Sequence, residues 1–302
     1  MRVRACLAFA MIGLLVVLPV ATAGCAASGS AQGDLLPQPE KRSFDGERAY
    51  QYALDQCDIG PRLPGSEAGW ATGDYILGKL AEFGWDTAAQ EFEYRGVRLR
   101  NIVGKRGQGP VVIIGAHYDT RPVADRDPEH PTEPIVGGND GASGVAVLLE
   151  LAAVLAQHEL PYEVWLVFFD GEDSGNLGGW PFCVGSSYMA QNLAVGPLWV
   201  IVVDMVGDRD QQFYYEGKSD PVLSEQLWDI AEDLGYPQFV PEPGRSINDD
   251  HVPFVNLGIR AVDIIDFDYP YWHTLGDTCD KLSADSLERV GRVLEELLVS
   301  KE

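Results

Sequence analysis

The sequence predicts an α/β fold in which helices cover both faces of a mainly parallel sheet. Short apolar runs such as residues 111–116 and 164–169 suit strands that are buried on both faces. Segments with helical periodicity lie between these runs, as the crossovers between parallel strands require. Hydrophobic residues make up 46% of the chain, which is enough to fill a substantial core.

The expected elements alternate along the chain. The helix at 66–83 ends before Gly84, a residue that favours the cap of a helix. The last helix is amphipathic, and its apolar face carries Leu287, Val290, Leu294 and Leu297. The expected helices are 46–57, 66–83, 142–158, 220–234 and 284–300. The expected strands are 90–94, 100–105, 111–116, 163–169, 198–203, 212–216 and 259–267.

The amino-terminal segment has the pattern of an export signal. Two arginines precede an apolar run at 7–20, and small residues follow at 21–24. A transmembrane anchor is the alternative, but the run is short for a span of about 20 apolar residues. Cys25 follows Ala and Gly as in a bacterial lipobox. We therefore expect a signal at 1–24 and a flexible tether at 25–44. The protein would be exported, either as a lipoprotein on the outer face of the membrane or in secreted form.

Charge and cysteine content exclude some classes of function. The formal charge of −24 argues against nucleic-acid binding, which requires a basic surface. Of the five cysteines, Cys6 lies in the signal and Cys25 is the candidate lipid site. The other three, Cys57, Cys183 and Cys279, show no zinc-finger spacing. About 260 residues remain after the tether, which suits one large domain or two small ones.

Polar residues follow most of the apolar strands. In a parallel sheet, ligands bind beyond the carboxyl ends of the strands, so we expect these residues to converge on one rim. They are His117 and Asp119, Asn139 and Asp140, Glu172 and Asp173, Asp204, and His273.

Each of these residues has an ordinary explanation when taken alone. Asp140, for example, fits the N-cap of the helix that follows it. Together they place several carboxylates and two histidines in one crevice, with no Lys or Arg in the strand-end motifs, so a divalent cation is expected. Imidazole and carboxylate ligands without thiolate suit catalytic zinc. Adjacent Glu172 and Asp173 point in different directions, so one can bind the metal while the other acts as general acid and base.

At these residues the chain resembles the zinc-dependent M28 peptidase superfamily. The matching motifs are GPRLPGS (60–66), GAHYDTRP (115–122), GGNDGASGVAVLLELA (137–152), FFDGED (168–173), VVDMVG (202–207), DDHVPF (249–254) and YWHTLGDT (271–278). The resemblance implies one α/β/α domain around a mixed sheet, over residues 45–302. It also suggests that Cys57 and Cys279, which lie near two of the motifs, form a disulfide.

Two activities occur on this family scaffold. Aminopeptidases of the family use two zinc ions, and glutaminyl cyclases usually use one. The family's two-metal set, with Glu172 as base, corresponds to His117, Asp140, Asp173, Asp204 and His273. All these positions are filled, so the ligands alone do not choose between the two reactions. A third hypothesis is a binding domain without catalytic activity. The intact Glu172 and the complete set of ligand residues argue against it.

Other features resemble the bacterial cyclases. Trp272 precedes His273, as the tryptophan that borders the substrate pocket does in cyclases. Segments 120–131 and 180–190 and Asp263 also resemble the bacterial cyclases. Several of these residues have an ordinary alternative explanation. Trp272 can be a core aromatic, Asp249 or Asp250 can cap a helix at 252–256, and Arg121, Asp125 and Asp127 can be ordinary loop charges. In the cyclase reading, Asp140, Asp173 and His273 bind one zinc, Glu172 is the acid and base, Asp204 and Asp249 belong to its hydrogen-bonding network, and His117 is not a ligand.

The resemblance therefore leads to one expected function and one alternative. We expect a zinc-assisted glutaminyl-peptide cyclotransferase that converts the N-terminal Gln of peptides or proteins to pyroglutamate and releases ammonia. The alternative is a two-zinc aminopeptidase. We also expect a monomer that binds no nucleic acid and contacts a membrane only through a lipid on Cys25.

Overall fold

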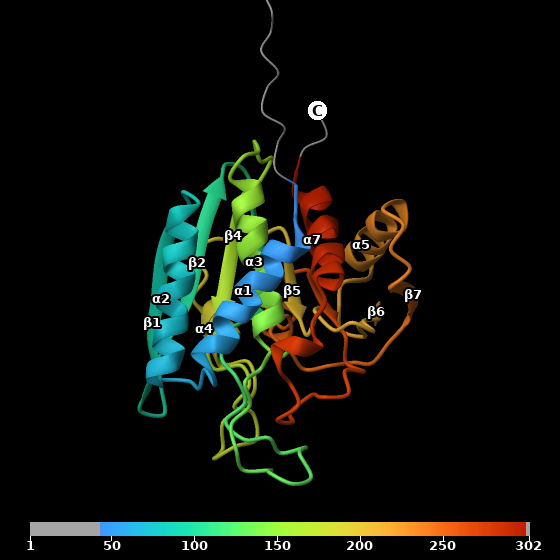
Figure 1. Cartoon of the computed structure of the whole chain (residues 1–302). Helices are drawn as coiled ribbons and strands as arrows, with labels where there is room; N and C mark the ends of the chain where they lie inside the picture. Colours follow the sequence, from blue (N-terminus) through green and yellow to red (C-terminus); the bar gives the residue numbers. More distant parts are fainter. Residues whose placement is uncertain (1–42, 300–302) are drawn as a thin grey trace, which may run out of the picture. The chain divides into compact units, whose positions relative to one another are not determined.

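The computed structural model describes residues 43–299, which form a mixed, mainly parallel sheet between two layers of helices (Figure 1). The predicted signal and nearly all of the predicted tether lie outside the described residues. The strands, in spatial order, are β1 (Asp86–Tyr94), β2 (Val97–Gly107), β4 (Glu163–Phe169), β3 (Val111–His117), β5 (Val200–Asp204) and β8 (Ala261–Ile265). β3, β4, β5 and β8 are parallel, and β2 runs antiparallel to both β1 and β4.

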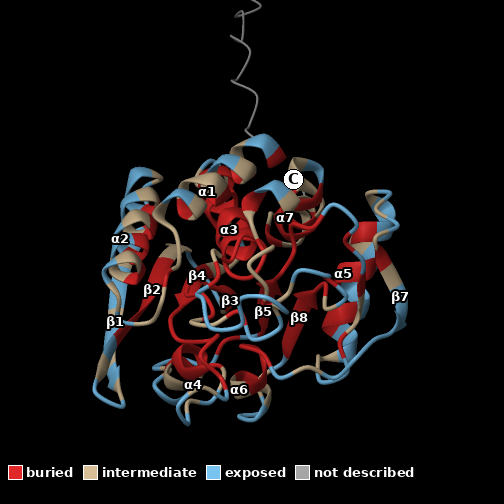
Figure 2. Cartoon of the chain, turned by 60° about the horizontal axis from the view of Figure 1, so that its bottom comes forward, coloured by how far each residue is buried: buried red, intermediate tan, exposed pale blue. Residues whose placement is uncertain are grey.

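Alternating side chains of the strands pack into two separate cores. On one face, residues such as Ile114 and Leu166 pack against helices α1 (Gly46–Ile59), α2 (Glu67–Glu82), α3 (Ala142–Leu155) and α7 (Ala284–Leu298). On the other face, residues such as Ile113 and Val167 pack against α4 (Val184–Gln191) and α6 (Val252–Val255). The three-layer α/β/α prediction is confirmed, and Figure 2 shows the buried central strands between the two layers.

Helix α3 is buried along its whole length, and the turn before it differs from the prediction. The helix begins after Gly141, whose φ of 101° suits glycine, and no described side chain caps it. Asp140 is therefore not an N-cap, and its carboxylate is free to face the site. Asp45, by contrast, caps α1 by accepting hydrogen bonds from the N–H groups of Glu47 and Arg48.

The predicted disulfide is confirmed. Cys57, near the end of α1, is bonded to Cys279 in the short 3₁₀ turn Cys279–Lys281. This bond joins the helix layer to the segment that follows His273. Cys183 is the free cysteine among residues 43–299.

The largest departures from prediction are at the edges. β1 and β2 extend into a long hairpin because Arg95 and Gly96 both adopt positive φ angles, as a two-residue hairpin turn requires. The predicted strand 212–216 is β6 (Phe213–Tyr215), which pairs with β7 (Phe239–Pro243) in a separate parallel sheet beside α5 (Pro221–Asp233) (Figure 1). Within the described part of the chain, no helix combines the length and the apolar character needed to cross a bilayer.

Candidate active site

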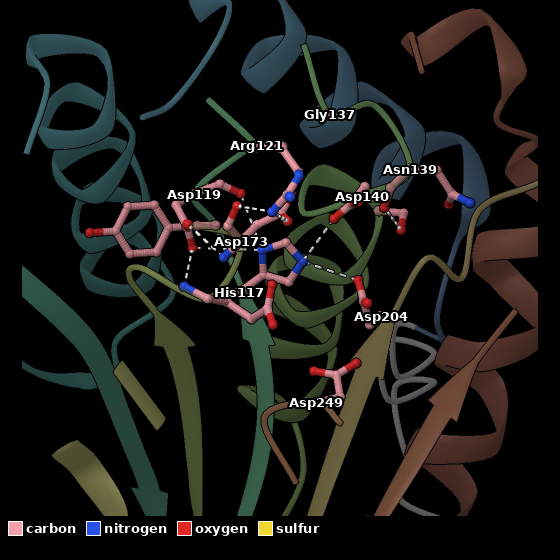
Figure 3. Close-up of polar contacts among 12 residues, drawn as sticks. His117, Asp119, Arg121, Gly137, Asn139, Asp140, Asp173, Asp204 and Asp249 are labelled. Carbon is pink, nitrogen blue, oxygen red and sulfur yellow. Dashed lines mark hydrogen bonds and ion pairs between the residues drawn. The ribbon is translucent and has the colours of Figure 1, made fainter. Parts of the chain in front are cut away.

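The predicted site residues meet at the carboxyl ends of the parallel strands. His117 ends β3, Asp204 ends β5, and Glu172 and Asp173 follow β4. Asp140 reaches the same place from the turn before α3, and Figure 3 shows His117 between Asp140 and Asp204. The structure therefore brings these residues together, as expected for polar residues that follow parallel strands.

Asp140, Asp173 and His273 form a compact group that suits a metal ion. Their candidate ligand atoms all lie within 4.8 Å of one another. His273 Nε2 lies 3.2 Å from Asp173 Oδ1 and 3.8 Å from Asp140 Oδ2. Among the described residues, no group donates a hydrogen bond to the buried Asp173 Oδ2. Two carboxylates, one of which has an unpartnered buried oxygen, and an imidazole fit a zinc ion at this position.

A second group shares Asp140 with the first. His117 Nε2 lies 3.2 Å from Asp140 Oδ1 and 3.1 Å from Asp204 Oδ1. Burial alone would lower the pKa of His117, but Asp204 and the contacts with Asp119 and Asp140 raise it well above its ordinary value. Asp140 therefore lies between two sets of candidate ligands. The geometry accommodates both the one-metal and the two-metal arrangement.

Arg121 and Asp125, which could have been ordinary loop charges, support His273 and Asp173. Asp125 Oδ1 lies 3.1 Å from His273 Nδ1, which leaves Nε2 facing the group of ligands. Arg121 is buried, donates to the Asp173 carbonyl at 3.1 Å and pairs with Asp125 at 2.7 Å. A carboxylate behind a ligating histidine is the usual way to orient its ring. Arg121 also places a positive charge beside the carboxylates, although the strand-end motifs themselves contain no Lys or Arg.

Two further carboxylates hold the backbone of the site. The sequence placed Asp119 among the polar residues expected at the rim without giving it a role, and it did not single out Asp277. The Asp119 carboxylate accepts hydrogen bonds from the N–H groups of Glu172 at 3.0 Å and Asp173 at 3.1 Å. Asp277 accepts from the N–H of Asp140 at 3.2 Å and from that of the residue before it. Both aspartates lie inside motifs noted above, and Asp119 also follows an apolar strand, but neither signal marks the backbone groups that they hold. Their partners are 53 and more residues away.

Glu172 stands apart from both groups and faces the cavity. Burial, with the nearby charges of Asp173 and Asp249, raises its pKa well above that of an ordinary glutamate. The Cys183 thiol lies 3.5 Å from Oε1 and donates to it. A buried carboxyl group with a raised pKa beside a metal site is suited to accept and return a proton.

Asp249 and Asp250 have a different role from the helix cap that was considered for them. No described side chain caps α6, and the Asp250 carboxylate contacts the Ser186 hydroxyl. Asp249 lies beside Glu172, and burial and Asp204 raise its pKa to about 7. Asp249 therefore adds a carboxylate to the wall of the cavity, and Asp250 is buried next to it in the chain.

The cavity has a volume of about 260 Å³, and Trp272 forms one wall. The Trp272 ring lies 4.1 Å from that of His273 and 4.8 Å from that of Phe267, measured between centroids. The Arg126 guanidinium covers Trp272 at 4.0 Å. Trp272 is therefore a fixed wall of the cavity and not a core aromatic. The lining residues are Asp140, Glu172, Asp173, Phe182, Asp204, Met205, Arg245, Ser246, Ile247, Asn248, Asp249, Ile265, Phe267, Trp272 and His273.

Comparison with known proteins identifies the family. Residues 101–298 match the model of peptidase family M28. The chain belongs to peptidase family M28. The candidate groups that could bind a metal ion in this chain fit a zinc-dependent family. A Zn-dependent exopeptidase from Parabacteroides distasonis has 31% identity and a TM-score of 0.81, over 87% of this chain and all of that one.

The similar M28 proteins carry both kinds of name. Aminopeptidase YwaD of Bacillus subtilis is 30% identical over 64% of this chain, which spans 42% of that longer protein. A glutaminyl-peptide cyclotransferase of Drosophila melanogaster is 26% identical over 83% of this chain and 81% of its own length. The structure of Bacteroides thetaiotaomicron glutaminyl cyclase bound to N-acetylhistamine has 34% identity and a TM-score of 0.81, over 87% of this chain and all of that one.

Proposed function

We propose that this M28 protein is a glutaminyl-peptide cyclotransferase that acts on peptides or proteins with N-terminal Gln. The observation that carries the proposal is the position of Trp272 in the wall of the cavity that also contains Glu172 and the Asp140, Asp173 and His273 group. A flat aromatic wall beside a metal site suits the planar side-chain amide of Gln. The near full-length similarity to proteins named as cyclases also supports it.

The residues of the cavity divide into those that hold a metal and those that move protons. Asp140, Asp173 and His273 would hold zinc, which supplies a Lewis acid for the side-chain amide carbonyl. Glu172 takes a proton from the α-amine as its nitrogen bonds to the side-chain carbonyl carbon. The same carboxyl returns that proton to the departing nitrogen, so the C–N bond of the amide breaks and ammonia leaves. Asp204 and Asp249 face the same cavity and would complete the network around Glu172.

Specific observations also favour a second function, a two-zinc aminopeptidase. The group of His117, Asp140 and Asp204 could hold a second ion that shares Asp140 with the first. The resemblance to aminopeptidase YwaD points the same way. In that reaction Glu172 would serve as base for a water nucleophile, and the N-terminal residue would be released.

A product assay separates the two functions. Purified protein is incubated with a Gln-peptide and with leucine amide, and zinc is counted by elemental analysis. We expect pyroglutamyl peptide and ammonia from the first substrate, and loss of both products in Glu172→Gln. Free leucine without any pyroglutamate would contradict the proposal and support the aminopeptidase.

We also propose that the protein acts outside the cytoplasm, with a lipid on Cys25. The proposal rests on the export pattern of residues 1–24. Labelling of cells with a radioactive fatty acid should mark the wild-type protein but not Cys25→Ala. An unlabelled wild-type protein would contradict the lipid assignment.

A further inference from the structure

A second cavity, of about 340 Å³, lies beside the active-site cavity. Arg245, Ile247, Ile265 and Phe267 line both cavities, so the two cavities share part of their wall. The outer wall of the second cavity comes from β6, which the sequence predicted as a strand, and from β7, which it did not. Its lining residues are Gln212, Tyr214, Glu216, Pro243, Gly244, Arg245, Ile247, Ile265, Phe267 and Asp268.

The charged groups of this cavity already have partners. The Glu216 carboxylate accepts hydrogen bonds from Ile247 N at 2.8 Å, Lys218 N at 2.9 Å and a serine hydroxyl at 2.8 Å. Arg245 pairs with Asp268 at 2.8 Å. A charged ligand would therefore compete with these existing contacts, whereas an apolar ligand would not.

The remaining lining is largely apolar and aromatic. Tyr214 presents its ring and donates its hydroxyl to Gln212 Oε1 at 2.9 Å. Pro243, Ile247, Ile265 and Phe267 add to this surface. Burial of an apolar side chain against such a wall stabilises a complex roughly in proportion to the area removed from water. The cavity is therefore suited to a large apolar or aromatic group.

The direction of the substrate chain connects the two cavities, and this step rests on the proposed function. The N-terminal residue must place its amine beside Glu172, so the second residue has to lie outside the first cavity. A third cavity, of about 220 Å³, also adjoins the active-site cavity, but the two have only Phe182 and Asn248 in common among their lining residues. The cavity beside β6 and β7 is larger than this neighbour and shares more lining residues with the active-site cavity. It is therefore the better place for the second residue of the substrate.

We propose that the cavity formed by Tyr214, Pro243, Ile247 and Phe267 binds the side chain of the second residue of the substrate peptide. It would select peptides in which that residue is large and apolar or aromatic. Nothing in the metal group or the base would change with the second residue. The selection should therefore appear mainly in KM.

The test compares peptides that differ only at the second position. Initial rates are measured for Gln-Phe-Ala-amide, Gln-Ala-Ala-amide, Gln-Glu-Ala-amide and Gln-Lys-Ala-amide with the zinc-loaded enzyme. We expect kcat/KM for the Phe peptide to exceed that for the Ala peptide by roughly tenfold, because the cavity buries part of the ring. The Glu and Lys peptides should do no better than the Ala peptide. Equal rates for all four, or a preference for a charged residue, would overturn the proposal.

Three variants identify the cavity that is responsible. Tyr214→Ala should reduce the Phe-to-Ala ratio from about ten to about two, and Tyr214→Phe should keep it, since the ring supplies the contact. Leu257→Ala removes a similar apolar group from the smaller neighbouring cavity and should leave the ratio unchanged. A ratio lost in Leu257→Ala and kept in Tyr214→Ala would place the second residue in the other cavity and refute the assignment.

The product distinguishes failure of this proposal from failure of the proposed function. If the enzyme forms pyroglutamate without selecting at the second position, the subsite is refuted and the cyclase stands. If it releases the free N-terminal residue instead, the cyclase is refuted. The same ratio, measured on that product, then decides the subsite.

Discussion

The Asp119→Asn variant tests whether Asp119 positions the candidate base Glu172 and the candidate metal ligand Asp173 without itself taking part in the reaction. The Asp119 carboxylate is fully buried and holds the N–H groups of Glu172 and Asp173, at 3.0 and 3.1 Å. Asparagine has nearly the same shape but keeps only one acceptor oxygen. Its amide nitrogen would then face one of the two N–H donors.

The cost follows from the two hydrogen bonds. A bond to a charged group contributes about 1.5–3 kcal/mol, and a buried donor left without an acceptor costs about 1–3 kcal/mol. We therefore expect Asp119→Asn to lower the free energy of unfolding by roughly 3 kcal/mol. Because Glu172 and Asp173 would both shift, kcat/KM for a Gln-peptide should fall by roughly a hundredfold. Zinc should be lost to a chelator at about tenfold lower chelator concentration.

Asp45 provides a matched control for this change. Its carboxylate also accepts hydrogen bonds from two backbone N–H groups, at 2.9 and 3.1 Å, but at the start of α1. Asp45→Asn should lower the free energy of unfolding by less than about 1 kcal/mol, since Asn caps helices nearly as well as Asp. Urea denaturation, steady-state kinetics and chelator competition measure the three quantities. Equal kcat/KM and zinc retention in the two variants would refute the positioning role of Asp119.

Three further predictions address other parts of the structure. Asp125→Asn should weaken zinc binding by about 10- to 100-fold because the His273 ring loses its carboxylate, and unchanged affinity in a competition assay would contradict this. Replacing both Cys57 and Cys279 by Ser removes a cross-link between residues 222 positions apart and should lower the free energy of unfolding by roughly 4 kcal/mol, as urea titration would show. Burial would raise the pKa of Glu216, but hydrogen bonds from its neighbours lower it from 4.5 to about 2. Since the folded-state pKa is the lower one, the stability that Glu216 contributes should be present above pH 4.5 and lost as the pH falls toward 2. A Glu216→Gln protein with the same dependence of unfolding free energy on pH would contradict this prediction.

The central strands and the site they carry followed from local sequence patterns. Residues 111–116 and 164–169 are apolar throughout, which indicates burial on both faces, and polar residues follow directly. Because parallel strands bring their carboxyl ends to one edge, His117 and Asp173 could be predicted to meet. Neighbouring side chains point in different directions, so Glu172 and Asp173 could also be expected to lie in different groups, as they do.

The supporting contacts could not be predicted in this way. Asp119 and Asp277 act on backbone N–H groups that are remote in sequence, and no local pattern marks such an acceptor. Arg121 is charged and lies in a polar loop, so its burial depends on the tertiary position of that loop. The short strand β7 (Phe239–Pro243) is exposed over most of its length and carries two prolines, so it lacks the signal of a strand.

The central claim is that one cavity holds a zinc site, a proton-transfer carboxyl and an aromatic wall suited to N-terminal Gln. Mass spectrometry of a Gln-peptide after incubation with the zinc-loaded protein tests it most directly. We predict a loss of 17 Da, the mass of ammonia lost when the peptide becomes its pyroglutamyl form, with no shortening of the chain and no such change with Glu172→Gln. A peptide shortened by its first residue, with no pyroglutamyl form, would contradict the claim and identify the protein as an aminopeptidase.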